Sequence, residues 1–245
     1  MTRQVHALLI AGDDPDQDGS PTANAEPALD NIEADLNTRF RLPNIKRLVN
    51  APTVQTVNAA FAQIGQQIRT TELLVVMFAG HGSEPTRAIL SQSWYLTTGE
   101  HYTDSELADR LLELTDRVDV VVISDCCYGQ GFFKVGPLRF PGRLQERFER
   151  LMLRRQSREL VGALGRRWDG ARRNSPMVCI SAASKDDLVF QANLPELTKK
   201  VAEAAKQGES YSQLKATFAS FTPAGGTYHV DARPSARMTD VVLHT

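Results

Sequence analysis

Four short apolar runs, separated by segments with helical periodicity, constrain the fold of this chain more than any other feature. Each run is rich in β-branched residues and lacks strict alternation, as is typical of strands buried on both faces of a parallel sheet. These runs are Val5 to Ala11, Leu73 to Phe78, Val118 to Ile123 and Met177 to Ala182. They predict the central strands of one sheet.

The segments between these runs carry the spacing of amphipathic helices. The clearest, Thr53 to Arg69, places apolar residues three and four positions apart after a threonine cap. A second helix is predicted to begin at Thr103, where Thr103 and Glu106 form the pattern of a capping box. Further helices are predicted from about Asn24 to Phe40 and from Leu194 to Lys206. This alternation predicts an α/β fold in which helices cover both faces of a mostly parallel sheet of about six strands.

Size and composition suit one compact unit. The chain has 245 residues, 42% of them hydrophobic, and contains neither an internal repeat nor a low-complexity linker, so residues 1–245 are predicted to form a single domain. No apolar run has the length of a membrane span and no signal-peptide pattern opens the chain, so we expect a cytoplasmic protein without membrane contacts. Since Cys126 and Cys127 are adjacent and adjacent cysteines rarely pair, reduced thiols are expected.

The charge of the chain is unevenly distributed. The stretch Lys134 to Arg173 carries 12 Lys or Arg against 4 Asp or Glu, a net +8, which leaves −9 for the remainder of a chain whose formal net charge is −1. This stretch, called here the basic insert (about residues 134–174), has three interpretations: a solvated amphipathic helix, a nucleic-acid patch or a processing linker. Composition alone does not decide among them, although the acidic remainder of the chain argues against nucleic acid as a partner.

Two of the predicted strands end in residues that can carry chemistry. His81 follows the second run, and Cys127 follows the third. In open parallel sheets, active sites form outside the carboxyl ends of the strands. A cysteine nucleophile needs a nearby imidazole that holds it as thiolate and later protonates the leaving amine. We therefore expect Cys127 to be a nucleophile and His81 to be its general acid and base.

The neighbours of these two residues support this interpretation. Gly80 and Gly82 flank His81, and because they lack side chains they would let a substrate backbone approach closely and leave the Gly82 amide free to face a developing oxyanion. The other two cysteines, Cys126 and Cys179, are interpreted as buried core residues. No motif surrounds the remaining histidines, so none of them is assigned a role.

The same segments resemble the motifs of the caspase-like peptidases, the group of caspases, metacaspases, paracaspases, clostripain and CHAT proteases. VVMFAGHGS is similar to the histidine motif, and VVISDCCYGQG is similar to the cysteine motif, with Cys127 at the position of the nucleophile. The separation between His81 and Cys127 is similar to the roughly 50 residues of the caspase signature. A third segment, CISAASKDD, resembles the metacaspase strand and loop SACxDDQ. Tyr128 and Leu188 depart from the metacaspase pattern, but neither belongs to the dyad.

This resemblance implies a caspase-like fold and a cysteine endopeptidase in which the amides of Gly82 and Cys127 form the oxyanion hole. It also implies that Asp125 and Asp187 line S1, the pocket for the substrate residue before the scissile bond. Two carboxylates pair with a guanidinium or ammonium group, so the implied substrates are proteins cut after Arg and, second, after Lys. The alternative from another class is a catalytically inactive scaffold that binds protein partners through the same cleft.

The place of the basic insert favours its interpretation as a processing linker. In caspases, the segment between the cysteine strand and the next strand is cut on activation, and the insert occupies that place here. The protein is therefore predicted to be a zymogen that is cut by itself or by an upstream protease, in a cascade of the kind that serves bacterial defence or cell death. The paired arginines in the insert are Arg154, Arg155, Arg166, Arg167, Arg172 and Arg173.

One acidic segment resembles part of a metal site. DPDQDG matches the first half of a calcium loop, with Asp14, Asp16 and Asp18 as oxygen ligands. The match then fails, because Ala25 stands where such a loop has Glu and because a strand is predicted where a helix should precede it. The segment is interpreted as a solvated acidic loop, with calcium binding as the alternative, and no other metal or cofactor is expected.

Overall fold

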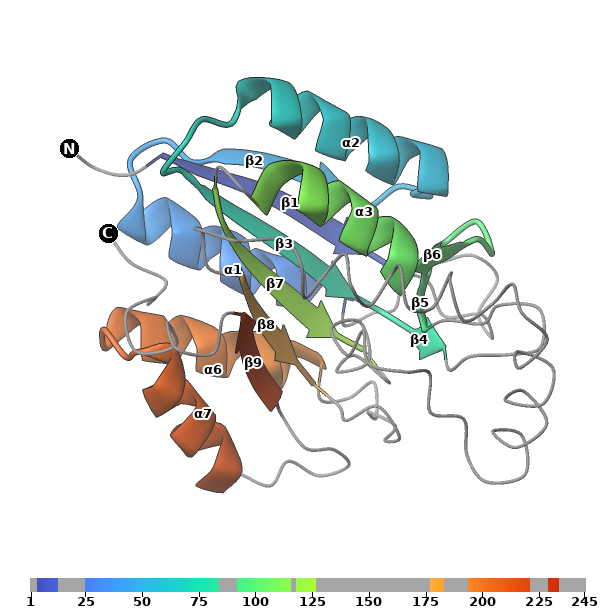
Figure 1. The fold of residues 1–245 in the computed structure, drawn as a ribbon. Helices are drawn as coiled ribbons and strands as arrows, with labels where there is room; N and C mark the ends of the chain where they lie inside the picture. Colours follow the sequence, from blue (N-terminus) through green and yellow to red (C-terminus); the bar gives the residue numbers. More distant parts are fainter. Residues whose placement is uncertain are drawn as a thin grey trace, which may run out of the picture.

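The computed structural model of the protein describes residues 4–12, 25–83, 92–115, 118–126, 177–182, 194–220 and 229–233. The strands of its main sheet are β1 (Val5–Ala11), β2 (Asn44–Leu48), β3 (Leu73–Ala79), β7 (Asp119–Asp125), β8 (Met177–Ser181) and β9 (His229–Arg233). They lie in the order β2-β1-β3-β7-β8-β9 (Figure 1). All neighbouring strands are parallel except β9, which runs antiparallel to β8. The predicted mostly parallel α/β sheet is confirmed.

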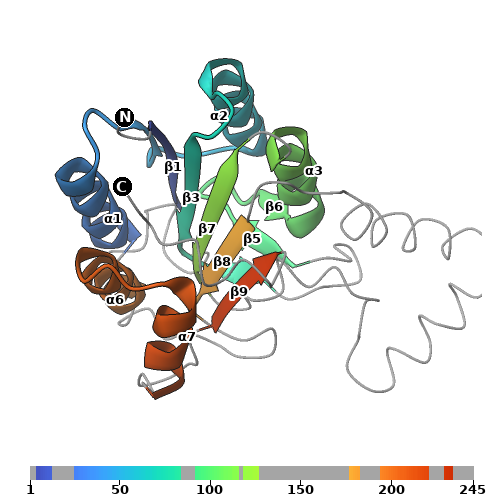
Figure 2. The same ribbon diagram turned by 60° about the vertical axis from the view of Figure 1, so that its left-hand side comes forward.

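Helices cover both faces of this sheet. They are α1 (Ala25–Arg39), α2 (Val54–Gln67), α3 (Asp104–Thr115), α6 (Leu194–Lys206) and α7 (Tyr211–Ser220). Helices α1 and α6 lie on one face and α2 and α3 on the other, while α7 lies near β9 (Figure 2). None of the helices in the described part of the chain is long and apolar enough to cross a lipid bilayer.

The core has two layers, one on each side of the sheet, because successive strand residues point to opposite faces. In β3, Val75 and Met77 pack toward α1 and α6, whereas Leu74 and Val76 pack toward α2 and α3. Every residue of β1 and β3 is buried. Burial on both faces explains why these strands are continuous apolar runs rather than alternating ones.

The four predicted strands and four predicted helices are all present. The capping box of α3 is confirmed, since Thr103 Oγ1 accepts from the Glu106 amide at 3.2 Å and Glu106 Oε2 accepts from the Thr103 amide at 2.8 Å. Strand β7 runs to Asp125, two residues further than predicted, because its pairing with β3 continues to that residue. The sequence did not predict β2, α7, β9 or the small sheet described next.

A second, three-stranded antiparallel sheet lies beyond the carboxyl end of β3 (Figure 1). Its strands, β4 (Gly82–Ser83), β5 (Ser93–Tyr95) and β6 (His101–Thr103), lie in sequence order. Strand β4 begins directly after His81. The small sheet therefore holds the chain that leaves β3 beside the expected active-site edge.

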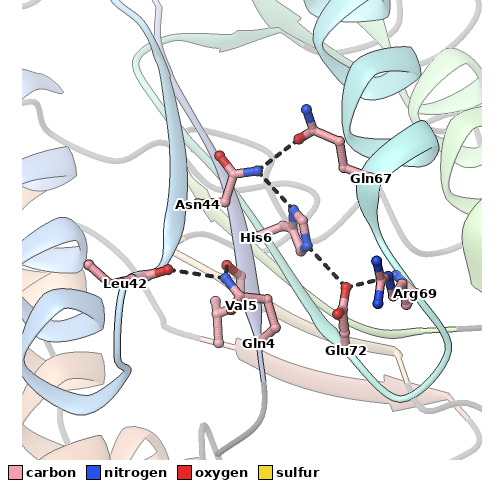
Figure 3. A network of polar contacts seen from close by, with 8 residues as sticks. All are labelled: Gln4, Val5, His6, Leu42, Asn44, Gln67, Arg69 and Glu72. Atoms are coloured by element: carbon pink, nitrogen blue, oxygen red, sulfur yellow. Dashed lines mark hydrogen bonds and ion pairs between the residues drawn. The ribbon is translucent and has the colours of Figure 1, made fainter.

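The opposite, amino-terminal edge of the main sheet carries a polar network around His6 (Figure 3). His6 is 4% exposed, its Nε2 lies 3.1 Å from Glu72 Oε2, and the Asn44 amide nitrogen lies 3.2 Å from its Nδ1. Asn44 also donates to Gln67 Oε1 at 2.8 Å, and the Arg69 amide donates to Glu72 at 2.7 Å. This histidine therefore has a structural role, joining β1 to β2 and to the loop between α2 and β3.

Candidate active site

Strands β3 and β7 end side by side. Ala79, the last residue of β3, pairs with Asp125, the last residue of β7, and the Gly80 amide donates to the Asp125 carbonyl oxygen at 3.2 Å. His81 and Cys127 each follow this last paired position by two residues. Cys127 itself lies outside the described residues. The structure thus brings together the two strand ends from which the predicted dyad comes.

His81 connects β3 to the small sheet. Its side chain is partly exposed, and its carbonyl oxygen accepts from the Tyr95 amide at 2.8 Å. The next residue, Gly82, is paired with Trp94 in the antiparallel ladder. Hydrogen-bonded and non-hydrogen-bonded pairs alternate in such a ladder. Since the Tyr95 amide bonds to the His81 carbonyl oxygen, Gly82 and Trp94 form a non-hydrogen-bonded pair, and the Gly82 amide points away from β5. A donor to a substrate oxyanion needs this orientation.

Gly80 is required for a reason that the sequence did not predict. Its φ is 153°, and a Cβ at this position would lie 2.7 Å from the Cα of Gly12. The backbones approach closely because the Gly12 amide donates to the Ala79 carbonyl oxygen at 2.7 Å. The chain's own backbone after β1 therefore makes a close approach that glycine permits here, whereas the expected approach of a substrate stays a prediction.

Asp125 is a buried carboxyl group at the end of β7. Its residue is 0% exposed, and neither carboxyl oxygen has a hydrogen-bond partner among the residues that the structure describes. Burial raises the pKa of the Asp125 carboxyl well above its ordinary value. A carboxyl group that is buried without a charged partner favours its neutral form.

Ser124 and Cys126 point to the other face of β7, toward buried aromatic rings. The indole Nε1 of Trp94 donates to Ser124 Oγ at 2.9 Å, and Ser124 Oγ lies 3.3 Å from Cys126 Sγ. Trp94 stacks on Phe78 with ring centroids 4.9 Å apart and on Tyr102 at 6.0 Å. Cys126 is completely buried, as predicted.

Sequence reasoning missed the contact between Trp94 and Ser124. One signal was available, because Ser124 is a polar residue in the apolar strand VVVIS, and buried polar groups in proteins almost always have a hydrogen-bond partner. The pattern indicates that a partner exists but not which residue it is. Cys179 on β8 is 3% exposed, which agrees with its predicted place in the core.

A cluster of hydroxyl groups around His101 joins the three strands of the small sheet. Ser93 Oγ lies 2.8 Å from His101 Nδ1 and 2.7 Å from Ser83 Oγ. Burial lowers the pKa of His101, which favours its neutral imidazole. Each strand contributes one member, and the cluster stabilises the sheet that follows His81.

Several predicted site residues lie outside the described residues. They are Cys127, Asp187, the six paired arginines of the basic insert and the segment Asp14 to Gly19. Their roles stay predictions, as does the division of the chain into one domain. Within the described ranges, no three His, Cys, Asp or Glu side chains gather closely enough to hold a metal ion.

No protein-family model and no curated protein matches this sequence. Solved structures do match. Protein GSU0716 from Geobacter sulfurreducens superposes with a TM-score of 0.65, at 18% identity over 94% of this chain and 93% of its own. Caspase-1 from Spodoptera frugiperda superposes with a TM-score of 0.54, at 10% identity over 94% of this chain and 86% of its own. The Drosophila initiator caspase Dronc superposes with a TM-score of 0.52, at 12% identity over 93% of this chain and 78% of its own. The chain has the caspase fold. At these identities the likeness shows the fold alone.

Proposed function

We propose that the protein is a cysteine endopeptidase that cuts proteins after Arg and, second, after Lys, with Cys127 and His81 as its catalytic dyad. The observation that carries the proposal is the pairing of Ala79 with Asp125 at the ends of two adjacent strands. His81 and Cys127 each follow one of these ends by two positions, so the dyad would form at this one sheet edge, where a thiol and an imidazole can form an ion pair.

In the proposed reaction, the Cys127 thiolate attacks the scissile carbonyl carbon, a C–S bond forms, and the carbonyl electrons move to the oxygen. The amides of Gly82 and Cys127 donate to this oxyanion. The His81 imidazolium then gives its proton to the leaving nitrogen as the C–N bond breaks, which leaves a thioester on Cys127. His81 next removes a proton from water, and the resulting attack on the thioester releases the acid product and the thiolate.

The buried carboxyl of Asp125 supports the proposed specificity. Asp125 lies one residue past Ser124 on the face away from Trp94, and no described residue bonds its carboxyl group. A guanidinium group of the substrate would supply the missing partner, and Asp187 is proposed as the second acid of the pocket.

The proposal includes activation by cleavage. The basic insert connects β7 to β8, two strands that are direct neighbours in the sheet. A cut in the insert, by the protein itself or by an upstream protease, would break the connection between the strand that leads to the proposed nucleophile and its neighbour β8. A proteolytic cascade in bacterial defence or cell death is the setting that we propose for such a zymogen.

A panel of fluorogenic peptides that differ only in the residue before the scissile bond tests this function. Wild type should cleave the Arg peptide best and the Lys peptide next, and Cys127→Ala and His81→Ala should show no cleavage. Cys126→Ala, which changes the neighbouring buried thiol, is the matched control and should retain most activity. Cleavage by Cys127→Ala would overturn the dyad. If wild type cuts no peptide and Cys127 is not labelled by an Arg-directed acyloxymethyl ketone, the inactive scaffold is the better description.

A further inference from the structure

Trp94 contacts both of the segments that lead to the candidate dyad, one through its backbone and one through its side chain. On one side, Trp94 pairs through its backbone with Gly82, the residue that follows His81. On the other side, its indole N–H donates to Ser124 Oγ at 2.9 Å, three residues before Cys127. One buried residue therefore connects the histidine segment with the cysteine strand.

The surroundings of Trp94 hold its indole ring in place. Its ring is parallel to that of Phe78 within 5°, and Tyr102 packs on it as well. All three residues are 0% exposed. Phe78 belongs to β3 and Tyr102 to β6, so the stack fastens the small sheet to the main sheet. A buried indole N–H needs a specific acceptor, which fixes the ring with respect to β7 as well.

We infer that Trp94 is a positioning residue for the proposed peptidase: its hydrogen bond to Ser124 holds the small sheet, and with it the segment that follows His81, against the strand that leads to Cys127. This inference rests on the proposed function. A dyad works only when the imidazole is within hydrogen-bond reach of the thiol, and a misplacement of about 1 Å can cost about 100-fold in rate.

Two substitutions remove the hydrogen bond from its two ends. Trp94→Phe keeps an aromatic ring in the stack but has no N–H, and Ser124→Ala removes the acceptor. The matched control is Tyr102→Phe, which removes a hydroxyl group from the same stack. That hydroxyl donates to Asn58 Oδ1 at 3.2 Å on α2, away from the dyad.

The first measurement is the rate at which iodoacetamide alkylates Cys127 as a function of pH, followed by mass spectrometry of the peptide that contains it. In wild type, His81 should stabilise the thiolate and so lower the pKa of the Cys127 thiol well below the ordinary value of about 8.5. Trp94→Phe and Ser124→Ala should move the pH midpoint of the alkylation rate toward that ordinary value. Tyr102→Phe should keep the wild-type profile.

The second measurement is peptide cleavage. Both variants should lower kcat about tenfold or more while KM changes less than about twofold, because substrate contacts are kept and only the dyad geometry changes. Since both remove the same hydrogen bond, the double variant should lose no more than either single variant.

The outcomes separate the inference from the function on which it rests. An ordinary thiol profile for Cys127 in wild type, with no peptide cleaved, would contradict the proposed function. A lowered midpoint in wild type that is unchanged in folded Ser124→Ala would contradict only the inference. If Trp94→Phe does not fold, the smaller change Ser124→Ala tests the inference by itself. Fully additive losses of kcat in the double variant would also overturn the inference.

Discussion

Ala79 and Asp125 are direct partners at the carboxyl end of the two central strands, β3 and β7. All seven residues of β3 pair with β7 in one unbroken register from Leu73 to Ala79. A slip of one residue would turn every side chain of a strand to the opposite face, so burial on both faces fixes this register. The core therefore determines where the segments that carry His81 and Cys127 leave the sheet.

The first prediction concerns the close approach at Gly80. Gly80→Ala should destabilise the fold by on the order of 3 kcal/mol, because its Cβ would lie 2.7 Å from the Gly12 backbone at a φ that side chains rarely adopt. Gly65→Ala in α2 is the control: its Cβ would lie 3.3 Å from a terminal carbon of Leu114, and helix propensity favours alanine. Unfolding in denaturant measures the free energy of unfolding of both variants. Equal stability of the two variants would contradict the close approach at Gly80.

The second prediction concerns the pH dependence of stability. Burial raises the pKa of Asp125 in the folded protein above its ordinary value of 3.8, so between these two pKa values the folded state binds more protons than the unfolded state. Stability therefore falls as pH rises through this window. Asp125→Asn cannot ionise, so its free energy of unfolding should exceed that of wild type by an amount that grows as the pH rises above 3.8. A constant difference, measured in urea, would indicate that the carboxyl has a charged partner.

The third prediction concerns specificity. Asp125→Ala and Asp187→Ala should each lower kcat/KM for the Arg peptide by about 100-fold or more, on the order of 3 kcal/mol, because a buried cation would lose its counter-charge. The Lys peptide should lose activity as well, and uncharged peptides should change little. If wild type instead preferred Asp before the scissile bond, the pocket assignment would be wrong.

The fourth prediction concerns processing of the basic insert. Purified wild type should show two fragments on a denaturing gel and elute as one species in gel filtration, because β8 is hydrogen-bonded to β7 along its length. Replacing the paired arginines by Gln should prevent the cut and lower activity. An uncut variant with wild-type activity would leave the insert as an ordinary solvated segment.

The fifth prediction concerns the network at the far edge of the sheet. His6→Ala removes one hydrogen-bond partner each from Asn44 and Glu72 and should cost about 1 to 3 kcal/mol of stability. Since this edge is opposite the candidate site, kcat of the folded variant should not change. Glu113→Ala, which breaks the exposed pair with Arg110, is the control and should cost at most about 0.5 kcal/mol. A loss of kcat in folded His6→Ala would contradict a purely structural role.

Long apolar strands and amphipathic helices could be predicted because their patterns are local. Strand β2, with the sequence NIKRL, could not, since Lys46 and Arg47 lie on a half-exposed edge strand without an apolar run. The strands of the small sheet have only two or three residues each, too few to show a pattern, and the stacking of Trp94 and the hydroxyl cluster around His101 hold them together.

For the candidate site, the sequence indicates which two strand ends carry the dyad, but not which contacts hold these strand ends in place. Ser124 and Asp125 read as the start of a loop because they are polar, yet they pair within β7. The bond between Trp94 and Ser124 joins residues 30 positions apart, and only the folded chain brings them together.

The connection from β7 to β8 covers residues 126–176, although the two strands are immediate neighbours. Parallel neighbours need a crossover of a dozen or more residues in any case. The entropy of closing a loop grows only with the logarithm of its length, at about 0.6 kcal/mol for each doubling. Two doublings separate a dozen residues from roughly fifty, so this connection costs only about 1.2 kcal/mol more than a minimal one. The length of this connection can therefore change in evolution at little thermodynamic cost to the sheet.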